Sequence, residues 1–457
     1  MVNLNWQKYP VYKSSGVEWL GDIPEHWEVN KLRWFVKIIS SNVDKNVDPS
    51  EKSIKLCNYL DVYNNNFISS SINFMKGSAN SNEIARYTLK VNDVIITKDS
   101  EDPNDIAIPA LVTENIDNLL CGYHLSILRP LKSKINGLYL LFIIKSSKVK
   151  SQFSRSAQGI TRYGLTYNSI KNVIITLPPL SEQQAIANFL DEKLAQIDEY
   201  IAKKQRIIEL LKEQKTVIIN QAVTKGINPD VPMKYSGVEW LGEIPEHWEV
   251  KKLKFIVLKI GSGKTPKGGG NVYSDSGVVF LRSQNIHFDR LRLDDVVYIN
   301  QLIDSKMAST RVKPNDVLLN ITGASLGRCQ IIPKNFPPAN VNQHVCIIRP
   351  NRKFIEPSFL FGIMASNAIQ AQIFSSENGS SREGLNFLQI ANFTLGMPPE
   401  ISEQKEIALF IEKKSEKIER SLTVIEKEIK LTQEYRTTLI SETVTGKIDV
   451  RKYHPPQ

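Results

Sequence analysis

The string in this chain that most resembles a chemical site is 261–265, which reads Gly-Ser-Gly-Lys-Thr like the end of a phosphate-binding P-loop. A complete P-loop also needs a glycine at position 258 and a helix directly after the threonine. This chain has Leu258, and Pro266 and a glycine run follow the threonine. The sequence therefore does not predict nucleotide binding at this loop.

Other catalytic patterns fail in the same way. A DNA methyltransferase would need a glycine-rich turn for the methyl donor and an Asn/Asp-Pro-Pro-aromatic turn, whereas 335–339 reads Asn-Phe-Pro-Pro-Ala. Glu428 and Lys430 could suggest a nuclease, but they lie in a helix of balanced charge, where solvated side chains are the ordinary interpretation. Neither a Ser-His-Asp order nor an HExxH string occurs. By elimination we expect a binding protein rather than an enzyme, with no catalytic residue.

Polar side chains in predicted loops could instead read DNA. Bases are read by hydrogen-bonding side chains on loops or helix starts, and neighbouring Lys and Arg hold the phosphates. In the C-terminal half the candidates are Lys264, Thr265, Lys267, Arg282, Ser283, Gln284, Asn285, Thr322, Ser325, Arg328, Ser380, Ser381 and Arg382. In the N-terminal half they are Lys98, Ser100, Arg155, Gln158, Thr161, Arg162 and Tyr163. The alternative for each is an exposed polar turn without a ligand.

Two long stretches, 181–224 and 402–445, contain neither Gly nor Pro and are each predicted as one helix. Each follows a Pro-Pro pair, and Gly226 and Gly446 close them. Their apolar residues follow the four-three spacing of a heptad seam: Leu190, Leu194, Ile197, Ile201, Ile208, Leu211 and Ile218, then Ile411, Ile418, Leu422, Ile425, Ile429 and Leu439. Lys204 and Lys215 fill polar positions of the first seam. Two matched seams predict that the helices pair, as a spacer or dimerisation arm rather than a buried hairpin.

The chain is an internal repeat. Residues 15–29 recur at 236–250 with only Asp22 replaced, by Glu243, and the offset of 221 residues also separates the two helices. The repeating unit is therefore one globular segment plus one long helix. Shorter patches that read as strands and turns also correspond, and each copy is expected to contain one further helix, at 138–150 and 357–374.

Composition sets broad limits. A length of 457 residues allows two or three domains, and the net charge of +10 lies in the globular segments and the tail, while the helices are nearly neutral. A polyanion would therefore meet the globular segments. The four cysteines form no CxxC pair and the histidines are dispersed, so we expect neither a metal site nor disulfides. With no long apolar run or signal peptide, we expect a cytoplasmic protein without a membrane partner.

Taken together, these motifs resemble a known family. Two diverged segments each open with Gly-x-Glu-Trp-Leu-Gly-x-Ile-Pro-x-His-Trp and close with Pro-Pro, Ser-Glu-Gln and a long helix. This combination is similar to the DNA-specificity subunit of type I restriction-modification systems, and the likeness covers essentially the whole chain. The second segment also carries family-like strings at 261–266, 320–323 and 381–386. The first departs from them, with 40–44 and 98–100 at the corresponding places.

The resemblance implies an α+β fold with two mixed α/β target-recognition domains, separated by an antiparallel coiled coil of the two long helices with a pseudo-two-fold repeat. The expected segments are recognition domains at 1–178 and 236–400, spacer helices at 179–225 and 401–446, a linker at 226–235 and a flexible basic tail at 447–457. Each domain would read one half of a bipartite, asymmetric site in double-stranded DNA, and the helices would fix the gap. Two methyltransferase subunits and ATP-dependent restriction subunits would be partners. S-adenosylmethionine, ATP and Mg²⁺ would serve those partners, and none would bind here.

Two alternatives stay open from the sequence. A coiled-coil adaptor with basic faces could bind protein or RNA, and a seam that closes within one chain could equally close between two chains. The sequence gives neither the recognised bases nor the gap length, because readout depends on how loops enter the grooves.

Overall fold

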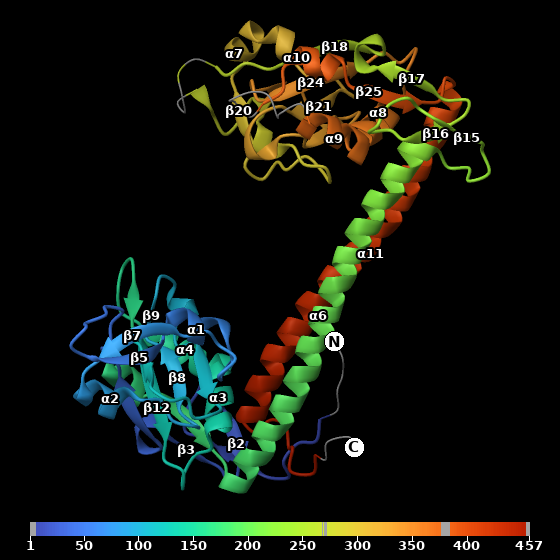
Figure 1. Cartoon of the computed structure of the whole chain (residues 1–457). Helices are drawn as coiled ribbons and strands as arrows, with labels where there is room; N and C mark the ends of the chain where they lie inside the picture. The colour runs from blue at the N-terminus through green and yellow to red at the C-terminus, as the bar shows by residue number, and fades with distance from the viewer. Residues whose placement is uncertain (1–5, 267, 269–271, 376–383, 454–457) are drawn as a thin grey trace. The chain divides into compact units, whose positions relative to one another are not determined.

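The computed structural model describes residues 6–266, 268, 272–375 and 384–453. The chain divides into two compact units (Figure 1). Unit 1 comprises Met1–Lys204 and Glu426–Gln457, and unit 2 comprises Gln205–Ile425. Each unit therefore contains one globular body and one end of both long helices, α6 (Leu180–Lys225) and α11 (Ile401–Val444).

Unit 1 contains short strands and short helices. Its strands are β1 (Tyr12–Ser14), β2 (Asp22–Pro24), β3 (Glu28–Lys31), β4 (Val36–Ser40), β5 (Lys52–Cys57), β6 (Phe67–Ile68), β7 (Met75–Ala79), β8 (Val94–Thr97), β9 (Asp99–Ser100), β10 (Pro109–Val112), β11 (Leu119–Cys121), β12 (Leu125–Pro130), β13 (Tyr163–Gly164) and β14 (Ile174–Leu177). Its helices are η1 (Leu32–Trp34), α1 (Tyr59–Asn64), α2 (Ser81–Tyr87), η2 (Pro103–Asp105), α3 (Gly137–Lys145), α4 (Ser147–Ser156) and α5 (Tyr167–Lys171).

The centre of unit 1 is a five-stranded sheet in the order β4-β12-β8-β10-β6. Alternate side chains of a strand point to opposite faces. Val94 and Ile96 accordingly join the core beneath α3, α4 and the long helices, whereas Ile95 joins the core shared with the three-stranded sheet β11-β5-β7. The central sheet is therefore buried on both faces, and only its ends and edges are free to present loops.

Unit 2 repeats this plan. Its strands are β15 (Met233–Tyr235), β16 (Glu243–Pro245), β17 (Glu249–Lys252), β18 (Val257–Ser262), β19 (Val278–Leu281), β20 (Val297–Ile299), β21 (Val317–Asn320), β22 (Cys329–Ile331), β23 (Ala339–Val341), β24 (Val345–Pro350) and β25 (Thr394–Met397). Its helices are η3 (Leu253–Phe255), η5 (Ser283–Asn285), α7 (Gln301–Lys306), η6 (Ala308–Thr310), η7 (Gly323–Ser325), α8 (Pro357–Met364), α9 (Asn367–Ser375) and α10 (Phe387–Ala391).

The strand orders β18-β24-β21-β22 and β20-β19-β23 match β4-β12-β8-β10 and β7-β5-β11 of unit 1. The recurring Asp-Val and Arg-Pro patches also have the same role in both copies. Asp93 and Asp316, each 1% exposed, accept Arg129 and Arg349 at 2.7 Å across the central sheet. The predicted α+β class with an internal repeat is confirmed.

The predicted pairing of the two long helices is also confirmed (Figure 1). In unit 1, Asp198 pairs with Arg436 at 2.9 Å and Lys204 with Glu428 at 2.7 Å. In unit 2, Lys215 pairs with Glu419 at 2.7 Å. Residue numbers rise on α6 as they fall on α11, so the helices run antiparallel. Each polar seam position named here has an acidic partner on the other helix, and such pairs fix register and orientation.

The predicted apolar seam residues lie along this pairing. Within 198–217 of α6, the partly buried positions are Ile201, Lys204, Ile208, Leu211 and Lys215, and the residues between them are exposed. On α11, Ile418, Leu422, Ile425 and Leu439 are buried, whereas Ile411 and Ile429 are partly buried. On α6 the seam is most buried near the start of the helix, where Leu190 and Leu194 join the core of unit 1.

The recurring Glu-His-Trp and Ser-Glu-Gln strings meet at the start of each long helix. Glu182 accepts the Trp27 indole at 3.1 Å and lies 2.7 Å from His26 Nε2, and the Tyr9 hydroxyl also donates to it. In unit 2, Glu403 accepts Trp248 at 2.9 Å and lies 2.9 Å from His247 Nε2. The strongest repeat in the sequence therefore joins each globular body to its helix.

Two expectations need correction. The predicted helix at 138–150 is two helices, because Ser146 leaves the helical conformation and caps α4, and 357–374 likewise divides into α8 and α9. The described part of the tail is packed rather than loose. Ile448 and Val450 are buried in unit 1, and the Asp449 backbone N–H donates to the Gln7 carbonyl at 2.7 Å. Burial of two apolar side chains offsets part of the cost of ordering the tail.

Candidate nucleic-acid interface

One end of the central sheet of unit 1 gathers four predicted residues. β8 leads into Lys98, and the following strand β9 pairs with β13, so that Tyr163 lies opposite Ser100 and Gly164 opposite Asp99. The Leu165 backbone N–H donates to the Lys98 carbonyl at 2.7 Å. Lys98, Ser100, Arg162 and Tyr163 therefore lie together, although they come from segments more than 60 residues apart.

Asp99 holds the charged part of this end in place. Its carboxylate oxygens lie 2.6 Å from the Arg162 guanidinium and 2.8 Å from His124 Nδ1. The hydrogen bond from Arg162 to Asp99 raises the pKa of the guanidinium, which stays fully charged. Because the Arg162 side chain is still 57% exposed, it keeps donors free for a ligand.

A short hairpin projects from this end. Gln158 and Gly164 exchange two backbone hydrogen bonds, at 3.0 and 2.8 Å, and close the loop between them. Gly159 has φ +147°, and a Cβ there would lie 1.9 Å from the Arg162 carbonyl oxygen, so this turn requires glycine. Ile160 is 91% exposed at the tip, beside the exposed side chains of Gln158 and Thr161. The loop thus presents an apolar tip between polar side chains.

The other predicted arginine of unit 1, Arg155, is hydrogen-bonded within its own helix. Arg155 is exposed on α4, and its Nε donates to the Ser151 carbonyl of the same helix at 3.2 Å. The loop after β9 also carries the exposed acids Glu101 and Asp102. These acids make this end of unit 1 less favourable for a polyanion than Lys98 and Arg162 alone would.

Unit 2 builds the corresponding end from equivalent strands. β18 and β21 are both antiparallel to β24, so both end on the same side. Thr322 forms a β-bridge with Gly384, as β9 does with β13, and its Oγ1 lies 2.6 Å from His344 Nδ1. The Arg328 backbone N–H donates to the Ser325 carbonyl at 3.1 Å. Thr322, Ser325 and Arg328 therefore lie on one tight turn.

Asn320 connects this turn to the segment that follows β19. Its side chain is fully buried and donates to the Ser283 carbonyl at 2.8 Å. Within the described residues, Asn320 Oδ1 and Arg282 Nε are buried without a hydrogen-bond partner. An unpaired buried polar atom costs about 1–3 kcal/mol. This corner of unit 2 therefore retains one unused acceptor and one unused donor.

The glycine-rich loop lies against the same end, in a conformation set by backbone contact. Gly263 has no room for a side chain, because a Cβ would lie 1.8 Å from the Val341 carbonyl oxygen. That carbonyl accepts the Lys264 backbone N–H at 3.2 Å, while the side chains of Lys264 and Thr265 are exposed. Gly263 thus permits a close approach of two chains, which agrees with rejecting a P-loop.

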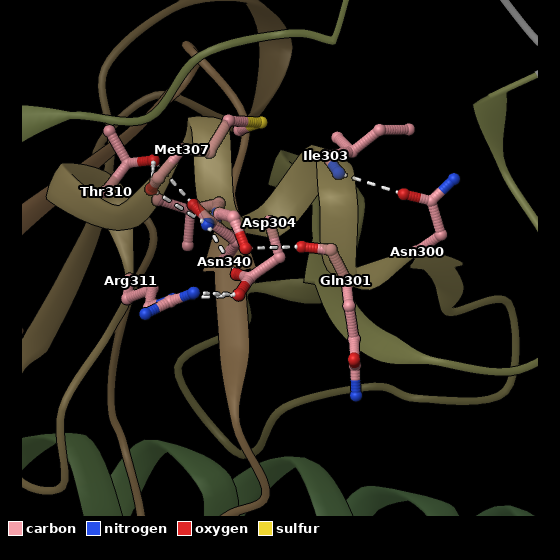
Figure 2. A network of polar contacts seen from close by, with 10 residues as sticks. Asn300, Gln301, Ile303, Asp304, Met307, Thr310, Arg311 and Asn340 are labelled. Carbon is pink, nitrogen blue, oxygen red and sulfur yellow. Dashed lines mark hydrogen bonds and ion pairs between the residues drawn. The ribbon is translucent and has the colours of Figure 1, made fainter.

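A buried polar network fixes the strand on which this loop rests, as Figure 2 shows. Asn340 on β23 donates to Asp304 at 3.1 Å and accepts the Thr310 hydroxyl at 2.6 Å, and Asp304 also accepts Arg311 at 2.8 Å. Burial raises the pKa of Asp304, but the hydrogen bonds from Arg311 and Asn340 outweigh burial and lower it. The carboxylate is therefore ionised and satisfied, and it ties α7 and η6 to β23.

The other predicted residues of unit 2 divide into three groups. Gln284 is exposed, and Arg282 and Ser283 are partly exposed beside it. The prediction that Asn285 is available to DNA needs correction. Asn285 is 1% exposed, and its side chain accepts the Arg282 backbone N–H and donates to the Arg292 carbonyl inside its turn. The predicted residues Lys267, Ser380, Ser381 and Arg382 lie outside the described residues.

Sequence reasoning missed Ile160 and Asn320. Two of the dispersed histidines, His124 and His344, are hydrogen-bonded at the sheet ends described above. Both histidines precede equivalent strands, β12 and β24, and they contact Asp99 in unit 1 and Thr322 in unit 2. No sequence pattern distinguishes Ile160 from a core isoleucine.

Other site types find little support in the described part of the chain. There, no three His, Cys, Asp or Glu side chains gather as a metal would require. The four cysteines are buried and free, and burial raises the pKa of each thiol, that of Cys346 to about 12. Among these residues no helix is long and apolar enough to cross a bilayer.

Comparison with known proteins shows the family. The family model of the type I restriction modification DNA specificity domain matches residues 24–212 and again 245–431. The chain belongs to this family. A putative type I restriction enzyme MjaX specificity subunit of Methanocaldococcus jannaschii is 24% identical, over 94% of this chain and 96% of its own length. The EcoBI specificity subunit of Escherichia coli is 27% identical over 57% of this chain and 56% of its own.

Solved structures share the fold of this specificity subunit. A chain from a type I R-M system, solved to study complex assembly and conformational transition, aligns over 93% of this chain and 99% of its own with a TM-score of 0.70 at 15% identity. The HsdS subunit of Thermoanaerobacter tengcongensis aligns over 93% and 98% with a TM-score of 0.51 at 14% identity. Both strengthen the assignment of the fold as a whole.

Proposed function

We propose that each unit of this type I specificity subunit reads one half of a bipartite, asymmetric site in double-stranded DNA. Each reading surface is the sheet end described above: Lys98, Ser100 and the 158–164 hairpin in unit 1, and the Lys264, Arg282 and Thr322 segments in unit 2. The observation that carries the proposal is that two copies of one scaffold present different polar side chains at the same sheet end. A shared scaffold with unlike loops suits two different half-sites.

The long helices act as the spacer between the two readers. Their ion pairs hold one register, so the number of residues in each helix sets the gap between half-sites. Methyltransferase subunits dock on the chain, and ATP-dependent restriction subunits join the complete complex in the cytoplasm. S-adenosylmethionine, ATP and Mg²⁺ serve those subunits, and this chain contributes no catalytic group.

Modified-base sequencing of DNA from cells that carry the complete system tests the proposal. We expect a two-part methylated motif with a fixed gap. Replacing 236–400 with the same region of another family member should change one half of the motif only. Modification at a continuous site, or a change in both halves after the exchange, would contradict the proposal.

A pair of matched arginine variants tests unit 1 more finely. Arg162→Ala removes an exposed guanidinium held by Asp99, and Arg155→Ala removes one that bonds only its own helix. A lost base or phosphate contact costs about 1–3 kcal/mol, so Arg162→Ala should weaken duplex binding at least about fivefold at constant salt. Arg155→Ala should leave it within twofold. A gel shift with duplex DNA and RNA of the same sequence would support the adaptor alternative if the chain preferred RNA.

A further inference from the structure

An aromatic and basic surface lies at the start of β4 in unit 1. We call it the Trp34 surface, and its residues are Arg33, Trp34, Leu131, Lys132, Lys134 and Leu180. Trp34 is 53% exposed, Leu131 41% and Leu180 42%. The Arg33 guanidinium lies 4.9 Å from the centre of the Trp34 ring. Trp34, Lys134 and Leu180 line an open groove of about 640 Å³, and Pro178, Pro179 and one exposed acid, Glu28, line it as well.

Unit 2 presents a matching surface, the Phe255 surface, made of Lys254, Phe255, Arg352, Lys353 and Phe354. Phe255 is 66% exposed and Phe354 46%, and Lys254 Nζ lies 5.2 Å from the Phe255 ring centre. The two surfaces have the same structural support. Gln183 donates to the Lys134 carbonyl at 3.1 Å, and Gln404 donates to the Phe354 carbonyl at 3.1 Å.

Both surfaces lie away from the proposed reading ends. In unit 1, Val36 at the start of β4 pairs with Pro130, beside the Trp34 surface. Ser40 at the other end of β4 pairs with Ser126, and this end lies next to the pair of Leu125 and Thr97 at the proposed reading end. Four residue steps of about 3.3 Å place the two ends roughly 13 Å apart along the strand alone. In unit 2, Val257 pairs with Pro350 at one end of β18, and Ser262 with Cys346 at the other. Neither surface therefore adjoins the side chains that would read bases.

The charge of the two surfaces is the same in sign. Each carries three exposed cations, which are Arg33, Lys132 and Lys134 in unit 1 and Lys254, Arg352 and Lys353 in unit 2. Within the described chain none of the six forms an ion pair. Exposed aromatic rings and arginine are enriched at protein interfaces, and the unpaired cations around the rings would suit a partner with an apolar pocket and an acidic rim.

We infer that the Trp34 and Phe255 surfaces dock two copies of one protein subunit, each offering an apolar pocket rimmed by carboxylates. The inference rests on the proposed function, in which methyltransferase subunits assemble on this chain. Two equivalent surfaces on a duplicated scaffold accommodate two copies of a single partner without a second binding mode. The rings lie at the opposite ends of β4 and β18 from the proposed reading ends, so the proposed reading of bases does not use them.

Native mass spectrometry of the full chain with its own methyltransferase subunit tests the inference. The wild-type chain should bind two subunits. Trp34→Glu and Phe255→Glu should each bind one, and the double variant none, with at least about 30-fold weaker binding at each altered surface. Val47→Glu and Leu302→Glu, at side chains each 67% exposed elsewhere, should still bind two.

Charge reversal supplies a variant that leaves the apolar residues intact. The double variant Lys132→Glu with Lys134→Glu should weaken subunit binding at unit 1 alone, and its circular dichroism melting curve should not change. If Trp34→Glu fails to fold, this variant tests the Trp34 surface in its place. Two bound subunits on the double Trp34 and Phe255 variant would overturn the inference and leave the proposed function standing. A wild-type chain that binds no methyltransferase subunit would overturn both. Loss of duplex binding with subunit binding unchanged would show a DNA contact and overturn the inference.

Discussion

Removing one heptad from both long helices should shorten the gap in the recognised site without changing either half. The deletion takes 208–214 from α6 and 420–426 from α11. It leaves the Lys204–Glu428 and Lys215–Glu419 pairs intact and moves them one heptad closer. Seven residues retain the seam, since the pattern repeats every seven. The helices therefore stay paired while the spacer becomes shorter.

The size of the effect follows from helix geometry. Seven residues at 1.5 Å each shorten the pair by about 10.5 Å, which is about three base pairs at 3.4 Å per step. Three base pairs turn the duplex by roughly 100°, whereas 10.5 Å of a coiled coil of about 150 Å pitch turns by only about 25°. The remaining twist must be absorbed by the DNA. We therefore expect slower modification together with the shorter gap.

Modified-base sequencing of cells carrying the variant system measures both quantities. The expected motif has unchanged half-sites and a gap about three base pairs shorter. Deletion of 208–214 alone leaves seven residues of α11 unmatched, and this control should lose the assembled complex. An unchanged gap in the double deletion, or altered half-sites, would refute the idea that the helices set the distance.

Three further predictions concern single residues. Glu182→Ala removes the acceptor of two buried donors and should lower the free energy of unfolding of unit 1 by about 3 kcal/mol. Glu403→Ala, at a side chain that is 30% exposed, should lower that of unit 2 by less. Hydrogen exchange measures the stability of the two units separately, and equal losses of stability would contradict this prediction. Ile160→Ala should weaken duplex binding by about 1 kcal/mol. The melting temperature should not change, because Ile160 is 91% exposed and contributes little to the core. An unaltered affinity in a gel shift would exclude a contact between Ile160 and DNA. Burial, with the nearby Arg436, lowers the pKa of Lys145 to about 8, so the unfolded chain holds more protons above pH 8 and stability should rise from pH 8 toward 9.5. Lys145→Met should flatten this rise in the melting temperature, and an equal slope would disprove the assignment.

Much of the architecture could be predicted because it depends on repeated local patterns. The heptad spacing, the glycines after each helix and the recurring 15–29 string indicated two units and a helix pair, and the comparisons and the structure confirm them. The packed tail could not be predicted. Ile448 and Val450 are buried in the core of unit 1, and Asp449 between them donates to the Gln7 carbonyl, more than 400 residues away in the chain.

The sequence predicted the residues of the candidate interface less completely than it predicted the fold. Lys98 and Arg162 lie together at one end of the central sheet of unit 1, and Thr322 lies at the corresponding end of the sheet in unit 2. Asn285 lies in a comparable segment, yet its side chain closes its own turn. Residue type alone does not separate these outcomes, because an amide can satisfy the backbone or a base equally well.

The sequence by itself determined the duplication, the length and pairing of the helices and the family, since each depends on spacing along the chain. Only the tertiary structure decided which side chains share a sheet end, which are consumed by internal bonds and which rings remain exposed. Those properties arise where distant segments meet. Hydrogen-bond satisfaction and burial there depend on neighbours in space, which spacing along the chain does not specify.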